Sequence, residues 1–243
     1  LALPGETIQE SIRVRNTGDT PIQFNSNVQD FIIGEDGQTP IAVNENVTTR
    51  WSLADWIVLA PQTDTLQPGE TAQIAVVIEV PEDALPGGHY AMITHQPNAG
   101  RPEGQTASAV NQRVGTLVYL TVEGPINEEA FIRNLTFPSF VEYGPVPFSL
   151  EVDNQSDIHI TPTISVDIHN FLGTKVETVT LETKNIFPFS SREFVGQWDR
   201  VWGMGPYTAK VTMNYGNQGR VTLATERFWL MPASLVAAGI VSL

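Results

Sequence analysis

The sequence contains no cysteine among its 243 residues. A disulfide framework, a thiolate metal site and a cysteine nucleophile are therefore all excluded. A chain of this length holds one or two domains, and either arrangement can bury a core without such cross-links. If the fold is immunoglobulin-like, it lacks the inter-sheet disulfide of antibody domains.

Positive charge is also scarce. The chain has 13 Lys and Arg residues against 27 Asp and Glu residues, which gives a formal net charge of -14. Nucleic-acid binding depends largely on Lys and Arg neutralising phosphates, so no nucleic-acid partner is expected. A polybasic membrane patch is excluded for the same reason. The acidity is typical of a protein that stays soluble at a surface.

The signatures of common catalytic and metal sites are missing as well. There is no Gly-x-Ser-x-Gly elbow and no phosphate-binding glycine loop. Asp153–Asp157 has the oxygen ligands that calcium prefers but lacks the glycine and final glutamate of a calcium loop, so a turn is the better interpretation. We expect no enzyme activity, no cofactor and no metal. The four histidines lack zinc-ligand spacing: His89, His95, His159 and His169.

Apolar residues instead alternate with polar ones at a period of two. This pattern is clearest in Pro147–Val152 and Ile160–Ile168, and it recurs along the chain between turn clusters. About seven short strands per half predict an all-β protein made of two tandem immunoglobulin-like β-sandwich domains. The boundary is placed at Gly124-Pro125, so that the domains cover residues 1–124 and 125–230.

The two halves share landmarks that support this division. Each has an Asn-led turn after an alternating strand, at Asn16-Thr17-Gly18 and at Asn154-Gln155-Ser156. Each also has a late Gly-x-Tyr element, Gly88-His89-Tyr90 and Gly205-Pro206-Tyr207, which resembles the tyrosine corner of immunoglobulin folds. We interpret these repeats as structural rather than as ligand-binding elements.

Four tryptophans are the candidate binding residues: Trp51, Trp56, Trp198 and Trp202. Exposed tryptophans stack on sugar rings or anchor a protein interface. Buried tryptophans are core or cap residues, and the sequence leaves both interpretations open. The polar, glycine- and proline-rich stretch 97–106 is a further candidate for recognition, as a long loop.

Residues 231–243 form an apolar stretch without charge that follows Trp229. The stretch is shorter than the roughly 20 apolar residues that span a bilayer. We interpret it as the start of a C-terminal transmembrane helix with Trp229 at the membrane interface. The alternative is a last core strand followed by a tail of small residues.

Several motifs of the first half point to a known family. They are Pro4-Gly5-Glu6-Thr7, Asn16-Thr17-Gly18-Asp19, Pro68-Gly69-Glu70 and Pro86-Gly87-Gly88-x-Tyr90. Over residues 1–123 this pattern resembles the peptidoglycan-binding-type domain of WxL-interacting bacterial surface proteins. The resemblance implies two immunoglobulin-like domains, the second for host or partner proteins, followed by one C-terminal transmembrane helix.

Together these observations predict a non-enzymatic bacterial cell-surface protein. The first hypothesis is attachment to peptidoglycan, a cell-wall polymer, or to a surface protein partner. The alternative is a chaperone-like or structural component of a surface appendage that acts by β-strand addition. The sequence sets no oligomeric state.

Overall fold

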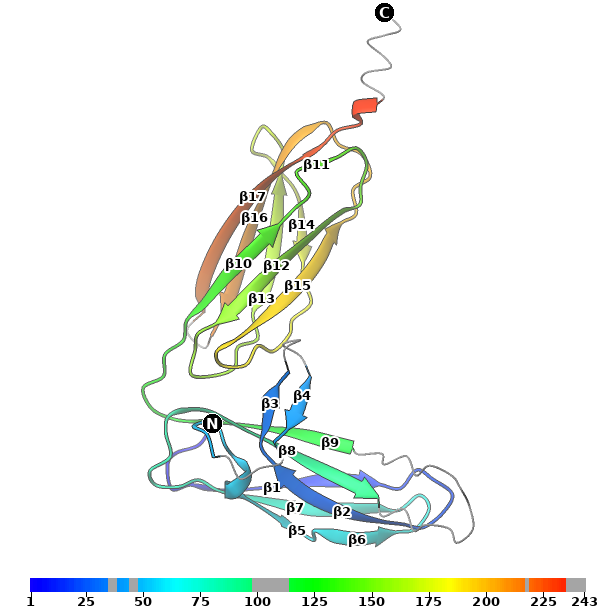
Figure 1. Ribbon diagram of the computed structural model, residues 1–243, viewed down its shortest axis with the longest axis vertical. Helices are drawn as coiled ribbons and strands as arrows, with labels where there is room; N and C mark the ends of the chain where they lie inside the picture. The colour runs from blue at the N-terminus through cyan, green and yellow to red at the C-terminus, as the bar shows by residue number, and fades with distance from the viewer. Residues whose placement is uncertain (35–38, 44–47, 98–113, 217–218, 235–243) are drawn as a thin grey trace, which may run out of the picture. The chain divides into compact units, whose positions relative to one another are not determined.

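The computed structural model describes residues 1–34, 39–43, 48–97, 114–216 and 219–234. The chain separates into two compact units, one holding Leu1–Gly34 and Pro40–Ile126 and the other Asn127–Leu243. Both consist of packed sheets in which nearly all strand pairs are antiparallel, β11 and β17 being a parallel pair (Figure 1). The prediction of an all-β protein with two immunoglobulin-like sandwiches is confirmed.

The first unit packs a three-stranded sheet, in the order β1-β7-β5, against a four-stranded sheet, in the order β6-β2-β8-β9. A small hairpin of β3 and β4 and a single 3₁₀ turn, η1, accompany them. Its strands are β1 (Thr7–Arg15), β2 (Ile22–Gln29), β3 (Phe31–Ile33), β4 (Pro40–Ala42), β5 (Ile57–Ala60), β6 (Thr63–Leu66), β7 (Thr71–Glu79), β8 (Gly87–Pro97) and β9 (Val114–Val122), with η1 at Ala54–Trp56.

The core of this unit follows from alternation along its strands. In β7 every second side chain is buried, from Ala72 through Ile74 and Val76 to Ile78. Residues i and i+2 of a strand share a face, so these side chains all point at the opposing sheet. The central strand β8 is buried over most of its length. β2 and β9 cover its two edges, Ala91 and Ile93 pack into the core, and Tyr90 on the other face meets the Phe31 ring.

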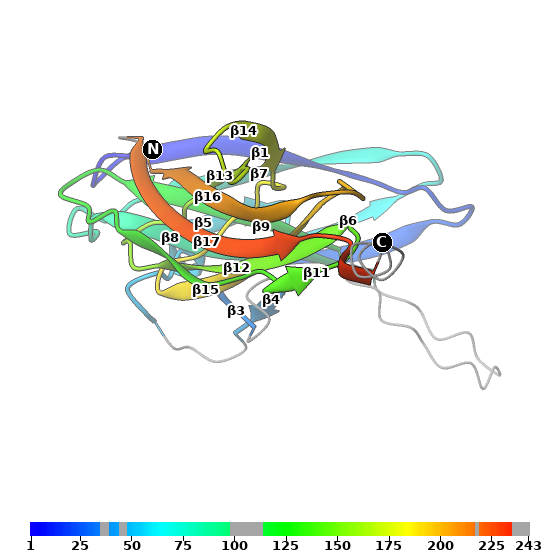
Figure 2. The same cartoon turned by 90° about the horizontal axis from the view of Figure 1, so that it is seen from above.

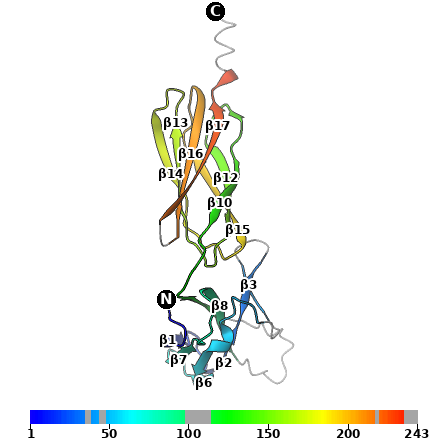
Figure 3. The same ribbon diagram turned by 90° about the vertical axis from the view of Figure 1, so that its left-hand side faces the viewer.

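The second unit has a three-stranded sheet, β10-β12-β15, and a five-stranded sheet, β11-β17-β16-β13-β14. Figures 2 and 3 show these sheets as two layers. The strands are β10 (Ala130–Thr136), β11 (Phe140–Val141), β12 (Val146–Asn154), β13 (Thr163–His169), β14 (Lys175–Thr180), β15 (Ser190–Trp198), β16 (Gly205–Tyr215) and β17 (Arg220–Leu230).

Its core is richer in aromatic side chains. Phe137 stacks between Phe148 and Phe228, at ring-centroid distances of 4.8 and 5.1 Å. Trp198 is fully buried and meets Tyr207 edge to face at 5.1 Å. Aromatic pairs in these geometries stabilise a core beyond the area that they bury.

The Asn-led turns play the same structural part in both units. The Asn16 amide donates to the carbonyls of Thr20 and Leu66. The Asn154 amide donates to the carbonyl of Ile158 and to two carbonyls of the Ile186–Phe187 segment. Each asparagine thereby bonds backbone carbonyls around its turn and on a neighbouring segment, and this contact occurs once in each sandwich.

The predicted recognition loop 97–106 lies outside the described residues except for Pro97. The chain between β2 and β3 is interrupted at Asp30, whose carboxylate accepts the backbone N–H groups of Leu53 and Ala54.

Candidate functional site: the free edge of strand β9

Strand β9 forms one end of the four-stranded sheet and pairs only with β8 among the described strands (Figure 1). Its core-facing residues are Val118, Leu120 and Val122, which pack into the first unit. The other edge of β9 carries backbone groups that β8 does not reach. An open strand edge of this kind is a template for pairing with a further strand.

One end of this free edge is already in use by the N-terminal segment. The Ala2 N–H donates to the Thr121 carbonyl and the Glu123 N–H donates to the Ala2 carbonyl, both over 2.9 Å. Ala2 thereby forms a parallel bridge at Val122. The edge accepts strand-type hydrogen bonds at this point, and the rest of β9 continues it.

The same bonds show which residues face the free edge. Backbone polar groups of successive strand residues point to opposite sides, so odd-numbered residues of β9 direct theirs away from β8. Gly115 and Leu117 are two of these. Within the part of the chain that the structure describes, no backbone group bonds to either residue along that edge.

β9 also lacks the protection that other edge strands carry. Natural edges are blunted by charged residues or by short length. Among the other edge strands in the described ranges, charged residues occur in β1, β10, β14 and β15. The edge strands β3, β4, β5, β6 and β11 have four residues or fewer. β9 has nine residues, Val114–Val122, and none is charged. It is therefore the described edge most suited to strand addition.

The outer face beside this edge is apolar and aromatic. Tyr90 of β8 meets Tyr119 of β9 edge to face at 5.6 Å, and Phe31 lies 6.3 Å from the Tyr90 ring. Leu117 is 37% exposed on the same face as Tyr119. A strand added to β9 would thus continue an apolar surface on this side of the sheet.

The four predicted tryptophans do not form one site. Trp198 is buried in the second unit, where its Nε1–H donates to a Glu177 carboxylate oxygen over 2.7 Å. Trp202 is 56% exposed and meets Tyr143 edge to face at 5.1 Å. Of the four, Trp202 has the exposure that ligand stacking requires, and its binding role stays a prediction.

Trp56 is the last residue of η1 in the first unit, and Trp51 precedes this turn. Both are half-buried. The Trp56 ring packs on His89 with centroids 4.4 Å apart, and the Arg50 guanidinium lies 4.4 Å above the Trp51 ring. These contacts hold the segment against β8, and no ligand contact has been tested for either tryptophan.

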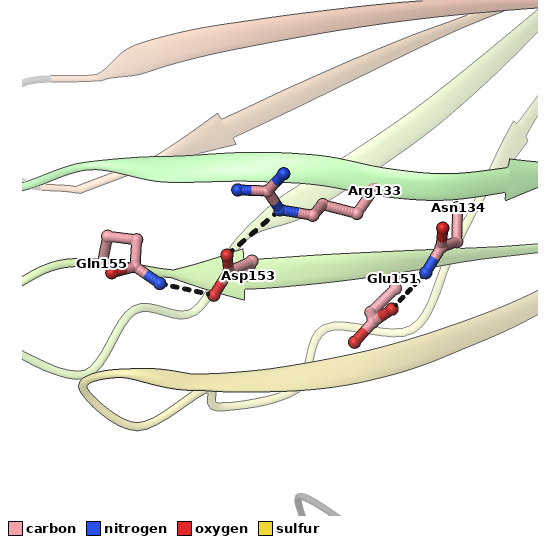
Figure 4. A network of polar contacts seen from close by, with 5 residues as sticks. All are labelled: Arg133, Asn134, Glu151, Asp153 and Gln155. Atoms are coloured by element: carbon pink, nitrogen blue, oxygen red, sulfur yellow. Dashed lines mark hydrogen bonds and ion pairs between the residues drawn. The ribbon is translucent and has the colours of Figure 1, made fainter.

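The segment that suggested calcium is part of a polar network on β10 and β12 (Figure 4). Asp153 accepts hydrogen bonds from Arg133 and Gln155, at 3.1 and 2.8 Å. Glu151 accepts one from the Asn134 amide at 2.7 Å. Hydrogen bonds from Ser191 and Asn134 lower the pKa of Glu151. The carboxylates are thus engaged within the sheet.

The histidines are likewise dispersed. Both ring nitrogens of His89 lie within 3.1 Å of backbone carbonyls, and His95 Nδ1 lies 2.9 Å from Ser26 Oγ. Burial lowers the pKa of His95 and that of His159. Within the described ranges, no group of three His, Asp or Glu residues is arranged to hold a metal ion.

Comparisons with known proteins give structural neighbours but no sequence relatives. No family model matches the sequence, and no curated protein does. The chain is similar to a structure described as the class 5 fimbriae chaperone CfaA, with 13% identity, a TM-score of 0.46 and coverage of 95% of each chain. A chain from a chaperone–tip adhesin complex of CFA/I fimbriae gives 11% identity, a TM-score of 0.46 and the same coverage. The E. coli chaperone DraB gives 18% identity and a TM-score of 0.38, with 94% of this chain and 92% of that chain covered.

The resemblance to WxL-interacting surface proteins is therefore wrong. No family model matches, and the similar structures named above are described as fimbrial chaperones or as a chaperone–adhesin complex, not as WxL-interacting proteins. The peptidoglycan-binding role that the resemblance implied is not supported. The transmembrane helix that it implied is not supported either, since no helix in the described residues is long and apolar enough to cross a membrane. Most of the predicted anchor, 231–243, lies beyond those residues.

The motifs behind that resemblance have a local explanation. Gly5 and Gly69 adopt φ values of +78° and +80°, which favour glycine. In both turns the glutamate after the glycine accepts the backbone N–H of the residue before the proline, at 2.7 Å. Pro-Gly-Glu thus encodes a self-capped turn between strands, which any sandwich can use.

Proposed function

We propose that the protein is a non-enzymatic, extracytoplasmic binding protein that adds an extended segment of a protein partner to the free edge of β9. The role is chaperone-like, or that of a structural component of a surface appendage. The partner segment would supply the backbone donors and acceptors that Gly115 and Leu117 lack. The observation that carries the proposal is the long, uncharged and incompletely paired β9 edge.

Strand addition suits this site for a physical reason. Main-chain hydrogen bonds give affinity for an extended peptide, while side chains on alternate positions give specificity. The bridge at Ala2 shows that the edge can pair, and its parallel direction shows one orientation in which a strand fits. An incoming segment can pair with Gly115 and Leu117 without displacing Ala2, which bridges at Val122.

A displayed library of random 12-residue peptides, selected on the whole chain, tests this proposal. We expect enriched peptides with alternating apolar residues. Leu117→Pro removes the one N–H that residue 117 directs to the free edge and leaves the bonds to β8, since a proline is tolerated on an outward edge position. Binding of the enriched peptides to this variant should fall at least about tenfold, the equivalent of one lost hydrogen bond or more.

Two further variants keep the test decisive. Leu117→Lys places a charge on the edge without changing the backbone, and it should also weaken binding. Leu223→Lys, on the exposed face of β17 in the second unit, is the matched control and should bind as the unchanged protein does. The proposal would be refuted if the enriched peptides bound Leu117→Pro and Leu117→Lys as tightly as the unchanged protein. It would also be refuted if the library yielded no peptide with alternating apolar residues.

A further inference from the structure

The hydrophobic core of the first unit is incomplete beside the start of β9. A cavity of about 280 Å³ lies there, lined from the three-stranded sheet by Ile12 and Val14 of β1 and from the four-stranded sheet by Phe24, His95 and Val114. β1 and β9 are the edge strands of these two sheets. The cavity therefore borders both of these strand edges, and its lining extends to β2 and β6.

The side chains that border it belong to the core faces of their strands. Val114 and Thr116 share the face of Val118 and Leu120, which pack into the core. Yet Val114 is 66% exposed. An apolar side chain that faces the inside of a sandwich and stays exposed lacks a covering contact among the described residues.

Strand alternation determines what can supply that contact. A segment paired with the free edge of β9 would direct every second side chain to the same side as Val114 and Thr116, over the gap between β1 and β9. Cavities that hold separate drug-sized ligands span roughly 300–1,000 Å³. This cavity lies just below that range, which suits a single side chain better than an independent ligand.

The polar groups at the cavity indicate which kind of side chain it can receive. His95 is buried and its Nδ1 lies beside Ser26 Oγ, and among the described residues its Nε2 has no hydrogen-bond partner. Burial lowers the pKa of His95, which disfavours the charged imidazolium. Arg13 and Arg15 of β1 also border the cavity, and apolar side chains supply most of the remaining lining. A Lys or Arg side chain would lose hydration here beside two like charges, whereas an apolar side chain would pack on the apolar part of the lining.

From these observations we infer that the cavity between β1 and β9 receives one large apolar side chain of the partner segment that pairs with β9. The inference deepens the proposed function and rests on it. It assigns the partner a requirement beyond an extended backbone: an aromatic or large aliphatic residue at one core-facing position. Removing this apolar side chain from water should strengthen binding by on the order of ten- to a hundredfold.

The cavity can be tested without any peptide. p-Cresol, which mimics an aromatic side chain, is titrated into the whole chain and followed by NMR. We expect saturable shifts at Val14, His95 and Thr116. Val14→Trp fills the cavity and should abolish them, whereas Val58→Trp, at an exposed position of β5 on the opposite edge of the same sheet, should not. Absence of saturable shifts at these residues would overturn the inference and leave strand addition to be judged by Leu117→Pro alone.

The peptide experiment then links the cavity to the strand. For an enriched peptide, replacing its large core-facing residue by alanine should weaken binding to the unchanged protein at least tenfold, as expected for a buried apolar side chain. Binding to Val14→Trp should be insensitive to the same replacement. If the alanine replacement weakens binding equally in both proteins, the side chain lies outside the cavity and the inference is overturned. It is also overturned if the protein forms a dimer that Leu117→Pro abolishes, because a second copy of the chain would then occupy the edge.

Discussion

Replacement of Asn154 by alanine should destabilise the second sandwich strongly. Asn154 is fully buried, and its amide donates to the carbonyls of Ile158, Ile186 and Phe187 at 2.9, 3.0 and 3.1 Å. Its Oδ1 accepts the Ser156 N–H at 2.9 Å. The side chain thus closes the turn between β12 and β13 and holds it against the segment before β15.

The size of this loss depends on which hydrogen-bond partners of Asn154 become unpaired in the alanine variant. The Ile186 carbonyl also accepts the Ile160 N–H, so it keeps a bond. The Ile158 carbonyl and the Ser156 N–H lose the bonds described here, and each buried orphan costs about 1–3 kcal/mol. We therefore expect a loss of about 3 kcal/mol in the free energy of unfolding, which lowers the Tm of this unit by about 10 °C.

The first sandwich offers a matched comparison. Asn16 makes the same kind of contacts, two through its amide and one through Oδ1, but part of its surroundings is exposed. Asn16→Ala should therefore cost less, about 1–2 kcal/mol. Asn154→Asp should be at least as damaging as Asn154→Ala, because its carboxylate would face the carbonyls that the amide now bonds.

Native-state hydrogen exchange reports the free energy of each unit separately and is the assay of choice. The reasoning is refuted if Asn154→Ala costs less than about 1 kcal/mol, the worth of one ordinary hydrogen bond. It is equally refuted if Asn154→Asp is tolerated.

Three further predictions concern packing and pH. Gly196→Ala should cost about 1–3 kcal/mol by denaturant unfolding, because a Cβ there would lie 2.6 Å from the Phe148 ring. Trp198→Ala should cost about 3–5 kcal/mol and Trp202→Ala about 0.5 kcal/mol or less, since the first is buried in the core and the second is exposed; equal losses would contradict these placements. Burial lowers the pKa of His95 in the folded protein, so its stabilising effect is present above its ordinary pKa of about 6.5 and is lost as the pH falls below it. Unfolding at pH 7.5 and 5.5 should show this loss in the first unit, and His95→Asn should reduce it.

The sandwich fold could be predicted from the sequence because apolar and polar residues alternate along its strands. Alternation in Pro147–Val152 gave the face of β12 that is buried, and the repeated asparagine turn marked the same corner in both units. The position of Trp198 was accessible too: Phe194, Gly196 and Trp198 share one face of β15, and that face is buried. The residues next to Trp198 in sequence do not carry this signal, which comes from the alternation along the whole of β15.

The candidate site was not accessible in the same way. β9 resembles any apolar strand in sequence, and its place at an edge depends on the order in which distant strands pair. The cavity likewise depends on the spacing between β1 and β9, which are separated by most of the first unit in sequence. The family resemblance failed for the opposite reason, since the Pro-Gly-Glu turns at Gly5 and Gly69 serve local turn geometry in sandwiches of many kinds.

Amide hydrogen exchange at two neighbouring residues of β9 tests the central claim most directly. The Leu117 N–H faces the free edge, whereas the Val118 N–H faces β8, which pairs with it through Ala91. With a saturating library-selected peptide bound, the account predicts that exchange at Leu117 slows by about tenfold or more while exchange at Val118 changes little. An unchanged Leu117 rate at saturation would contradict strand addition at β9.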